Sequence, residues 1–240
     1  MKWADFFTSS IGKKLIMSLS GIFLVLFLIV HVGLNACIWA NDGGVMFNKA
    51  AHFMGANIIP RILEIGLFAG FLLHIIQGFV LEFQNRSKRK IGYHVPMGNR
   101  GSKWYSRSMG LLGTLLLLFL IMHISHFWVP SRITGLEPVY IDVTNGALVQ
   151  AAAPNAKEYH DLFGKMREVF TGNLLIVILY VIGCISLAWH LLHGFQSAFR
   201  TLGLSNHKYI GLISAAGTGF SIIVPLAFAM MPVSFYLGWV

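Results

Sequence analysis

The chain has 240 residues, of which 56% are hydrophobic and 11% are charged, and its mean hydropathy is +0.69. Soluble globular domains are roughly 45–50% apolar and about 25% charged, so this composition excludes an ordinary soluble domain and predicts an integral membrane protein. The formal net charge of +9 is accounted for by basic residues beside the apolar segments, and we expect no nucleic-acid partner.

Five apolar segments follow one another along the chain, at 15–39, 59–83, 109–129, 173–198 and 210–238. Each reaches the about 20 residues that a membrane crossing needs, and none alternates with the period of two of a membrane strand. The first begins after Lys13 and Lys14 and lacks a small-residue cleavage site, so we expect it to stay in the mature chain. The sequence predicts a single all-α domain over 1–240, a bundle of five transmembrane helices.

Basic residues predict the orientation of this bundle, because Lys and Arg are enriched on the cytoplasmic side of membrane proteins. With the N-terminus inside and the C-terminus outside, twelve of the 18 Lys and Arg residues flank the segments on the inside. Seven of them lie in the loop 86–107, which could also contact anionic lipid or a soluble partner. We therefore expect a multi-pass protein of the inner (cytoplasmic) membrane, with the polar loop 130–172 as an ordered or semi-ordered connection on the outside and not as a second domain.

Four histidines lie deep inside four of the five segments: His31, His74, His123 and His190. An imidazole in hydrocarbon is costly unless it faces the bundle interior and has a partner. With a rise of about 1.5 Å per residue, His31 and His123 lie roughly 21–24 Å along helices that begin inside. By the same measure, His74 and His190 lie roughly 22–26 Å along helices that begin outside. The sequence thus predicts an outer and an inner histidine pair, each able to bind one metal centre.

One buried histidine by itself is more often hydrogen-bonded to a neighbouring helix than bound to a metal, but four at two matched depths favour two bis-histidine haems. Neutral imidazole is a good iron ligand. His126 and His193 each follow a candidate by three residues on the same helix face, and each could be a ligand, a propionate contact or a packed polar residue. The chain has no C-x-x-C-H sequence for covalent attachment, so the predicted cofactors are two haems of the b type.

Titratable groups near the outer end of the second segment are candidates for the quinone site that the family resemblance described below implies. Quinone chemistry moves two protons with two electrons, so the site needs proton-exchanging groups near a haem and near water. Glu64 is the candidate proton-exchanging group, with His52 or Arg61 as its hydrogen-bond partner. The alternative is that Arg61 and Glu64 form an interfacial ion pair with a structural role only. Trp39 and Trp128, near segment ends, are interpreted as interfacial anchors.

Several stretches resemble one protein family: SGIFLVLFLIVHVGLN, FNKAAHFM, LEIGLFAGFLLHIIQG, RSMGLLGTLLLLFLIMH and AWHLLHG. They are similar to the single-chain di-haem cytochrome b subunit of succinate:quinone oxidoreductases, the succinate dehydrogenases and quinol:fumarate reductases of the respiratory chain and the tricarboxylic acid cycle. The resemblance covers nearly the whole chain and is weakest in the loop 130–172 and in the last helix.

The resemblance implies a five-helix membrane anchor with two haem b groups and a menaquinone site. It also implies a cytoplasmic iron–sulfur subunit that in turn binds a flavoprotein, where the dicarboxylate chemistry takes place. A dimer of such heterotrimers is compatible with it.

The same resemblance implies three haem ligands at His31, His74 and His123. The fourth ligand of the family stands four residues before a glycine that is followed nine residues later by another. Gly194 and Gly203 fit this spacing and select His190 over His193. Some fumarate-reducing members have a glutamate two residues before the fourth ligand, where this chain has Ala188, so we expect no proton route through such a group.

Two other classes remain open. One is a di-haem cytochrome b anchor of a different respiratory complex, such as a hydrogenase or a formate dehydrogenase. The other is a haem-free, histidine-lined transporter for a metal ion or for protons. A visible spectrum separates the transporter from both cytochromes, and the co-purifying subunits separate the two cytochromes.

Overall fold

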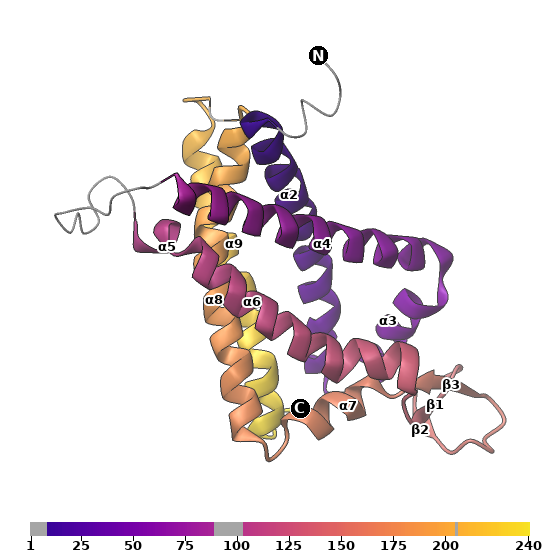
Figure 1. The fold of residues 1–240 in the computed structure, drawn as a ribbon. Helices are drawn as coiled ribbons and strands as arrows, with labels where there is room; N and C mark the ends of the chain where they lie inside the picture. Colours follow the sequence, from indigo (N-terminus) through magenta and orange to yellow (C-terminus); the bar gives the residue numbers. More distant parts are fainter. Residues whose placement is uncertain (1–8, 89–102, 205) are drawn as a thin grey trace. The chain divides into compact units, whose positions relative to one another are not determined.

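The structure is a computed structural model that describes residues 9–88, 103–204 and 206–240. Its five long helices are α2 (Ser10–Asn35), α4 (Ile58–Ser87), α6 (Met109–His123), α8 (Leu174–Thr201) and α9 (Ile210–Tyr236) (Figure 1). Within the described residues, five helical spans are long and apolar enough to cross a membrane: Ser10–Ala40, Ile58–Ser87, Met109–Thr134, Leu174–Thr201 and Ile210–Tyr236. The prediction of five membrane helices is confirmed, and the orientation of the termini stays a prediction. Most of the basic loop 86–107 lies outside the described residues.

Shorter elements connect these helices. They are the 3-10 turn η1 (Ala36–Ala40), α3 (Val45–Ala56), α5 (Trp104–Arg107), the π-helical segments η2 (Ile124–Trp128) and η3 (Pro130–Thr134), the strands β1 (Pro138–Asp142), β2 (Leu148–Val149) and β3 (Ala156–His160), and α7 (Leu162–Phe170). The strands form an antiparallel sheet in the order β2-β1-β3. The all-α prediction missed this sheet, because strands of two to five residues carry too short a pattern to be recognised in a polar loop.

The described residues form two compact units. The first contains the described parts of Met1–Leu28, Gly66–Leu117 and Ile185–Pro225, and the second contains Ile29–Ile65, Leu118–Cys184 and Leu226–Val240. Each unit takes a part of all five membrane spans. The predicted inner histidine pair falls entirely in the first unit, and the predicted outer pair falls entirely in the second.

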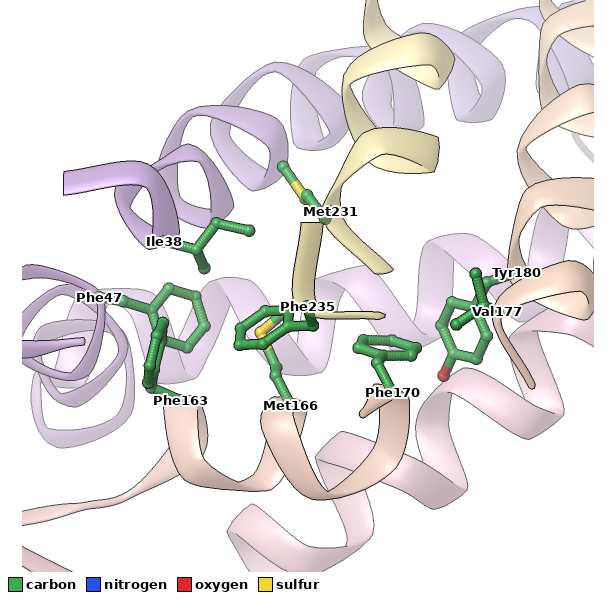
Figure 2. Packing of buried hydrophobic residues seen from close by; sticks show 9 residues of the cluster. All are labelled: Ile38, Phe47, Phe163, Met166, Phe170, Val177, Tyr180, Met231 and Phe235. Carbon is green, nitrogen blue, oxygen red and sulfur yellow. The ribbon is translucent and has the colours of Figure 1, made fainter. Parts of the chain in front are cut away.

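The core of the second unit is an aromatic cluster that includes α7 (Figure 2). Its buried members are Ile38, Phe47, Phe163, Met166, Phe170, Val177, Tyr180, Met231 and Phe235. The α7 residues follow the spacing i, i+3, i+7 and therefore lie on one helix face. Burial of a large apolar side chain contributes about 1.5–3 kcal/mol, so this face attaches α7 to the rest of the unit.

Asn48 joins α3 to the start of α7. Its side chain is almost fully buried, and its Nδ2 donates to Asp161 Oδ1 at 2.9 Å while its Oδ1 accepts from the Phe163 N–H at 2.9 Å. Asp161 in turn caps α7 by accepting from the Gly164 N–H. Gly44 precedes α3 with φ of +88°, and a Cβ there would overlap the Phe163 ring, so this position requires glycine.

Replacing Asn48 tests this junction. Asn48→Ala leaves the Phe163 N–H without its acceptor in a buried place, which costs about 1–3 kcal/mol. We expect a lower midpoint of thermal unfolding of the purified protein in detergent. Asn57→Ala is the control, because Asn57 is exposed and donates to Phe53 O on the neighbouring turn. If both variants unfold at the same temperature, Asn48 does not stabilise this junction.

Candidate functional site

The predicted inner pair meets in the first unit. His74 is carried by α4 and His190 by α8, and their ring centroids are 6.2 Å apart with an interplanar angle of 64°. A glycine lies beside each ring. A Cβ added to Gly21 would be 3.6 Å from His74 Cε1, and a Cβ added to Gly113 would be 3.9 Å from His190 Cε1. These small residues let the helix backbones come close to the imidazoles.

The predicted outer pair meets in the second unit. His31 on α2 and His123 at the end of α6 have ring centroids 5.8 Å apart at an angle of 88°. Phe119 stacks on His123 at 5.6 Å, Phe127 lies at 5.4 Å from it, and Phe228 lies 5.4 Å from His31. The two imidazoles are therefore enclosed by aromatic side chains.

Both ring separations fit one metal ion bound between two imidazoles. A metal–imidazole bond is about 2.0–2.1 Å long, as it is for zinc, and a ring nitrogen lies about 1.1 Å from the ring centre when ring bonds are about 1.33 Å. Two rings on opposite sides of one ion therefore have centroids about 6.3 Å apart. The observed separations of 6.2 and 5.8 Å lie close to this value. Ordinary aromatic contacts span the same range, so the partners of the ring nitrogens matter as well.

One ring nitrogen in each pair is buried and unpaired. Among the described residues, His123 Nδ1 and His190 Nδ1 have no hydrogen-bond partner. A buried polar atom without a partner costs about 1–3 kcal/mol. The other ring of each pair has a polar neighbour, since His74 Nδ1 lies 3.1 Å from Ser20 Oγ and His31 Nδ1 lies 3.4 Å from Asn35 Nδ2. Two neutral imidazoles, one of them oriented by a polar neighbour, form a suitable donor set for a haem iron.

The two alternate histidines have different surroundings. His126 Nδ1 lies 2.9 Å from the Tyr180 hydroxyl, and the two rings stack at 5.9 Å and 9°. This is the packed polar role that the sequence left open for it, and it favours His123 as the ligand. On α8, the ring that contacts His74 is that of His190, which favours His190 over the partly buried His193.

A change of helix type follows His123. The α6 helix continues as the π-helical segments η2 and η3, and Pro130 stands at the start of η3. Proline lacks the N–H of the helix ladder, and its ring clashes with the carbonyl four residues earlier, here that of His126. Single π-helical turns often occur at functional sites. Pro130 is the sequence signal for this irregularity, which was not predicted from the apolar pattern of the segment 109–129.

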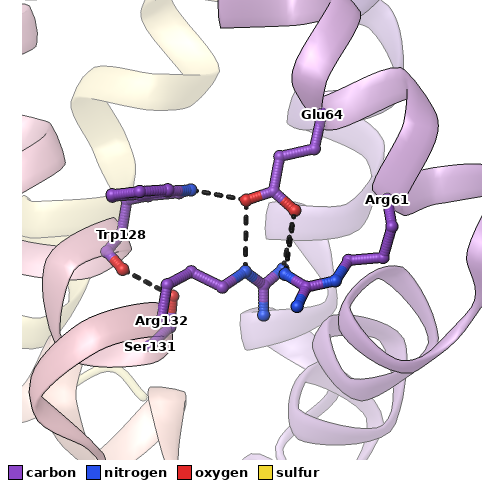
Figure 3. Close-up of polar contacts among 5 residues, drawn as sticks. All are labelled: Arg61, Glu64, Trp128, Ser131 and Arg132. Atoms are coloured by element: carbon purple, nitrogen blue, oxygen red, sulfur yellow. Dashed lines mark hydrogen bonds and ion pairs between the residues drawn. The ribbon is translucent and has the colours of Figure 1, made fainter.

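Glu64 lies at the centre of a polar cluster in the second unit (Figure 3). The indole N–H of Trp128 donates to Glu64 Oε1. Arg132 Nε donates to Oε1 at 3.1 Å and its Nη2 donates to Oε2 at 3.3 Å. Arg61 Nη1 lies 3.4 Å from Oε2. The sequence predicted the pairing of Glu64 with Arg61, but not its contacts with Trp128 and Arg132. The four-residue spacing of Trp128 and Arg132 in a helix-forming segment could have indicated their shared face.

His52 has a different environment from the other two residues of the predicted quinone site. Its ring lies edge-on to the Tyr159 ring of β3, with centroids 4.9 Å apart. Burial lowers the pKa of His52, and electrostatic interactions with Lys157 and His160 lower it further. The imidazole is therefore mainly neutral at pH 7. The side chain of Glu64 is hydrogen-bonded by Arg61, Trp128 and Arg132, so the structure brings Arg61 and Glu64 together, while His52 packs on the sheet.

No family model, no curated protein and no solved structure matches this chain. Function is therefore inferred from the residues and their geometry. The geometry offers two sites of two imidazoles each, one per unit, and one half-buried carboxylate cluster in the same unit as His31 and His123.

Glu64→Gln tests the carboxylate as a proton-exchanging group. The amide keeps the shape and one acceptor but cannot carry the proton, so we expect quinone-linked turnover to fall by about 10²-fold or more, the scale of a lost acid–base group. Haem content and succinate oxidation with a soluble dye should stay at the wild-type level. Glu82→Gln is the control, since Glu82 lies on the same helix and also pairs with an arginine, Arg86.

Turnover near the wild-type level in Glu64→Gln would place the quinone site elsewhere. The cluster of Glu64, Trp128 and Arg132 would then have a structural role, which is the alternative that the sequence left open. An equal loss in Glu82→Gln would point to a general effect of removing a paired carboxylate from α4.

Proposed function

We propose that the chain is the membrane anchor and electron-transfer subunit of a succinate dehydrogenase or fumarate reductase complex. In this role it would pass electrons through two b haems between an iron–sulfur subunit and menaquinone, with the dicarboxylate chemistry on a flavoprotein partner. The observation that carries the proposal is the meeting of four membrane histidines in two pairs at 6.2 and 5.8 Å, which agrees with the spacing of two axial ligands on one iron.

The chain's own residues would hold each haem from two helices. His74 and His190 would bind the inner iron, and His31 and His123 the outer iron. A bound b haem supplies one-electron transfer, at a potential that burial and hydrogen bonds adjust. The aromatic side chains that pack on His123 give the outer pair a largely apolar surrounding, and a low local dielectric strengthens polar contacts there.

The quinone would bind on the side of the outer pair. Glu64 is the proposed proton-exchanging group, with Arg61 orienting its Oε2 and with His52 as a second titratable group in the same unit. The half-buried position of Glu64, with 18% of its side chain exposed, leaves a route for protons to water. Arg132 and Trp128 fix the carboxylate geometry.

Haem content provides the direct test. We expect pyridine haemochrome analysis to give two b haems per wild-type chain. His74→Ala or His190→Ala should remove one haem, because the inner haem would be held by these two histidines and either change removes one of them. His193→Ala is the matched control on the same helix and should retain both.

One haem or none in the wild-type protein would contradict the proposal, and the complete absence of haem would favour the histidine-lined transporter. Two haems with His193 essential would contradict only the choice of ligand. The subunits that co-purify, identified by size and by flavin fluorescence, separate a succinate dehydrogenase or fumarate reductase from a hydrogenase or formate dehydrogenase anchor.

The proposed docking face makes a second prediction. Electrons must enter near the inner pair, so the soluble subunits should cover the N-terminal residues, the loop 86–107 and the loop 199–209. The loop 86–107 holds seven Lys and Arg residues, which are trypsin sites. We expect assembly of the complex to protect these sites, whereas Lys157 in the loop 130–172 serves as the control and stays equally cleavable. Protection of Lys157 alone would contradict the topology or the partner assignment.

A further inference from the structure

Ser20 has an arrangement that the proposed function has not used. It lies on α2, is 6% exposed, and belongs to the same unit as His74. Its Oγ lies 3.1 Å from Met17 O on its own helix and 3.1 Å from His74 Nδ1 on α4. A hydroxyl has one proton and two lone pairs. Both contacts are hydrogen bonds at once only if Oγ donates to Met17 O and accepts from a proton on His74 Nδ1.

We infer that Ser20 is a positioning residue of the inner site, whose hydroxyl holds His74 in the tautomer with the proton on Nδ1 and so leaves Nε2 as the metal ligand. The inference rests on the proposed haem binding at His74 and His190. It concerns a residue that does not touch the metal and acts through His74.

The opposite ring of the inner pair strengthens this assignment. His190 Nδ1 is buried and has no hydrogen-bond partner within the described part of the chain. Of these two Nδ1 atoms, that of His74 has a side-chain partner, the Ser20 hydroxyl, which can therefore orient one ring of the inner pair. In addition, the α2 backbone lies against the His74 ring at Gly21, where a Cβ would be 3.6 Å from His74 Cε1. The contacts with Ser20 and Gly21 therefore position the His74 ring against α2.

The surroundings of Ser20 make this hydrogen bond hard to replace. Ser20 lines a groove of about 370 Å³ between α2 and α4 whose other lining residues are apolar or glycine: Ile16, Leu19, Phe23, Gly66, Gly70 and Leu73. A low local dielectric strengthens a hydrogen bond and raises the cost of losing one. Removing the hydroxyl would leave the Nδ1–H of His74 facing apolar side chains.

A hydrogen bond from Nδ1–H makes the imidazole a more basic ligand, and loss of such a partner typically lowers metal affinity about 10–100-fold. A more basic ligand stabilises ferric over ferrous iron. Ser20→Ala should therefore raise the midpoint potential of the inner haem and weaken its retention, while the outer haem keeps both properties.

The experiment is a redox titration of the purified complex in detergent, followed at the haem α band. For Ser20→Ala we expect a shift of about tenfold in the redox equilibrium of one haem, which is 59 mV for a one-electron couple. Ser20→Cys keeps the size of the side chain with a weaker acceptor and should give a smaller shift in the same direction. Ser18→Ala is the matched control: Ser18 is 5% exposed on the same helix, and among the described residues it makes no hydrogen bond to a histidine.

Two results would overturn the inference. Wild-type potentials of both haems in Ser20→Ala would show that Ser20 only packs against His74, and an equal shift in Ser18→Ala would show a general packing effect. If Ser20→Ala does not assemble, the comparison of Ser20→Cys with the wild type decides in the same way. Absence of haem from the unmutated protein is a separate outcome, which overturns the proposed function itself.

Discussion

A polar atom inside the hydrocarbon of a membrane must find a partner within the protein, and this constraint organises the whole chain. Helices satisfy the backbone of the five spans. The imidazoles cannot satisfy themselves, and each must meet a side chain from another helix or a bound group. The Ser20 hydroxyl lies within hydrogen-bonding distance of His74, and the Tyr180 hydroxyl lies within hydrogen-bonding distance of His126. Among the described residues, the imidazole nitrogens that are buried without a partner are His123 Nδ1 and His190 Nδ1, and both belong to the facing pairs, where a bound metal would lie.

The cluster around Glu64 solves the same problem without a ligand. Its carboxylate oxygens accept from an indole and from two guanidinium groups, so its hydrogen-bonding capacity is largely used by the protein. The histidine pairs have buried nitrogens that the described residues do not use. This contrast separates a cluster whose hydrogen-bonding groups are paired within the protein from two histidine pairs that each have an unused ring nitrogen among the described residues.

The elements outside the membrane spans contribute to the outer pair by packing. Phe170 of α7 contacts Tyr180 at 4.9 Å, and Tyr180 contacts both His126 and His123. Asn48 fixes the start of α7 against α3. A continuous set of side chains therefore runs from the polar loop to His123. The loop 130–172 is in this respect part of the structure that holds the site, in addition to connecting two helices.

The sequence by itself determined the five membrane spans and the four histidines within them, because hydropathy and span length are local properties of about 20 consecutive residues. The constant rise of about 1.5 Å per residue along an α-helix also predicted the depth of each histidine, and hence the two pairs that meet in the structure. Only the tertiary structure decided which side chains hydrogen-bond to the buried polar groups. Ser20 and His74 are 54 residues apart, Glu64 and Arg132 are 68 apart, and Asn48 and Asp161 are 113 apart. Such contacts depend on how helices pack and on the π-helical turn at Pro130, and no local pattern encodes the rotation of one helix against another.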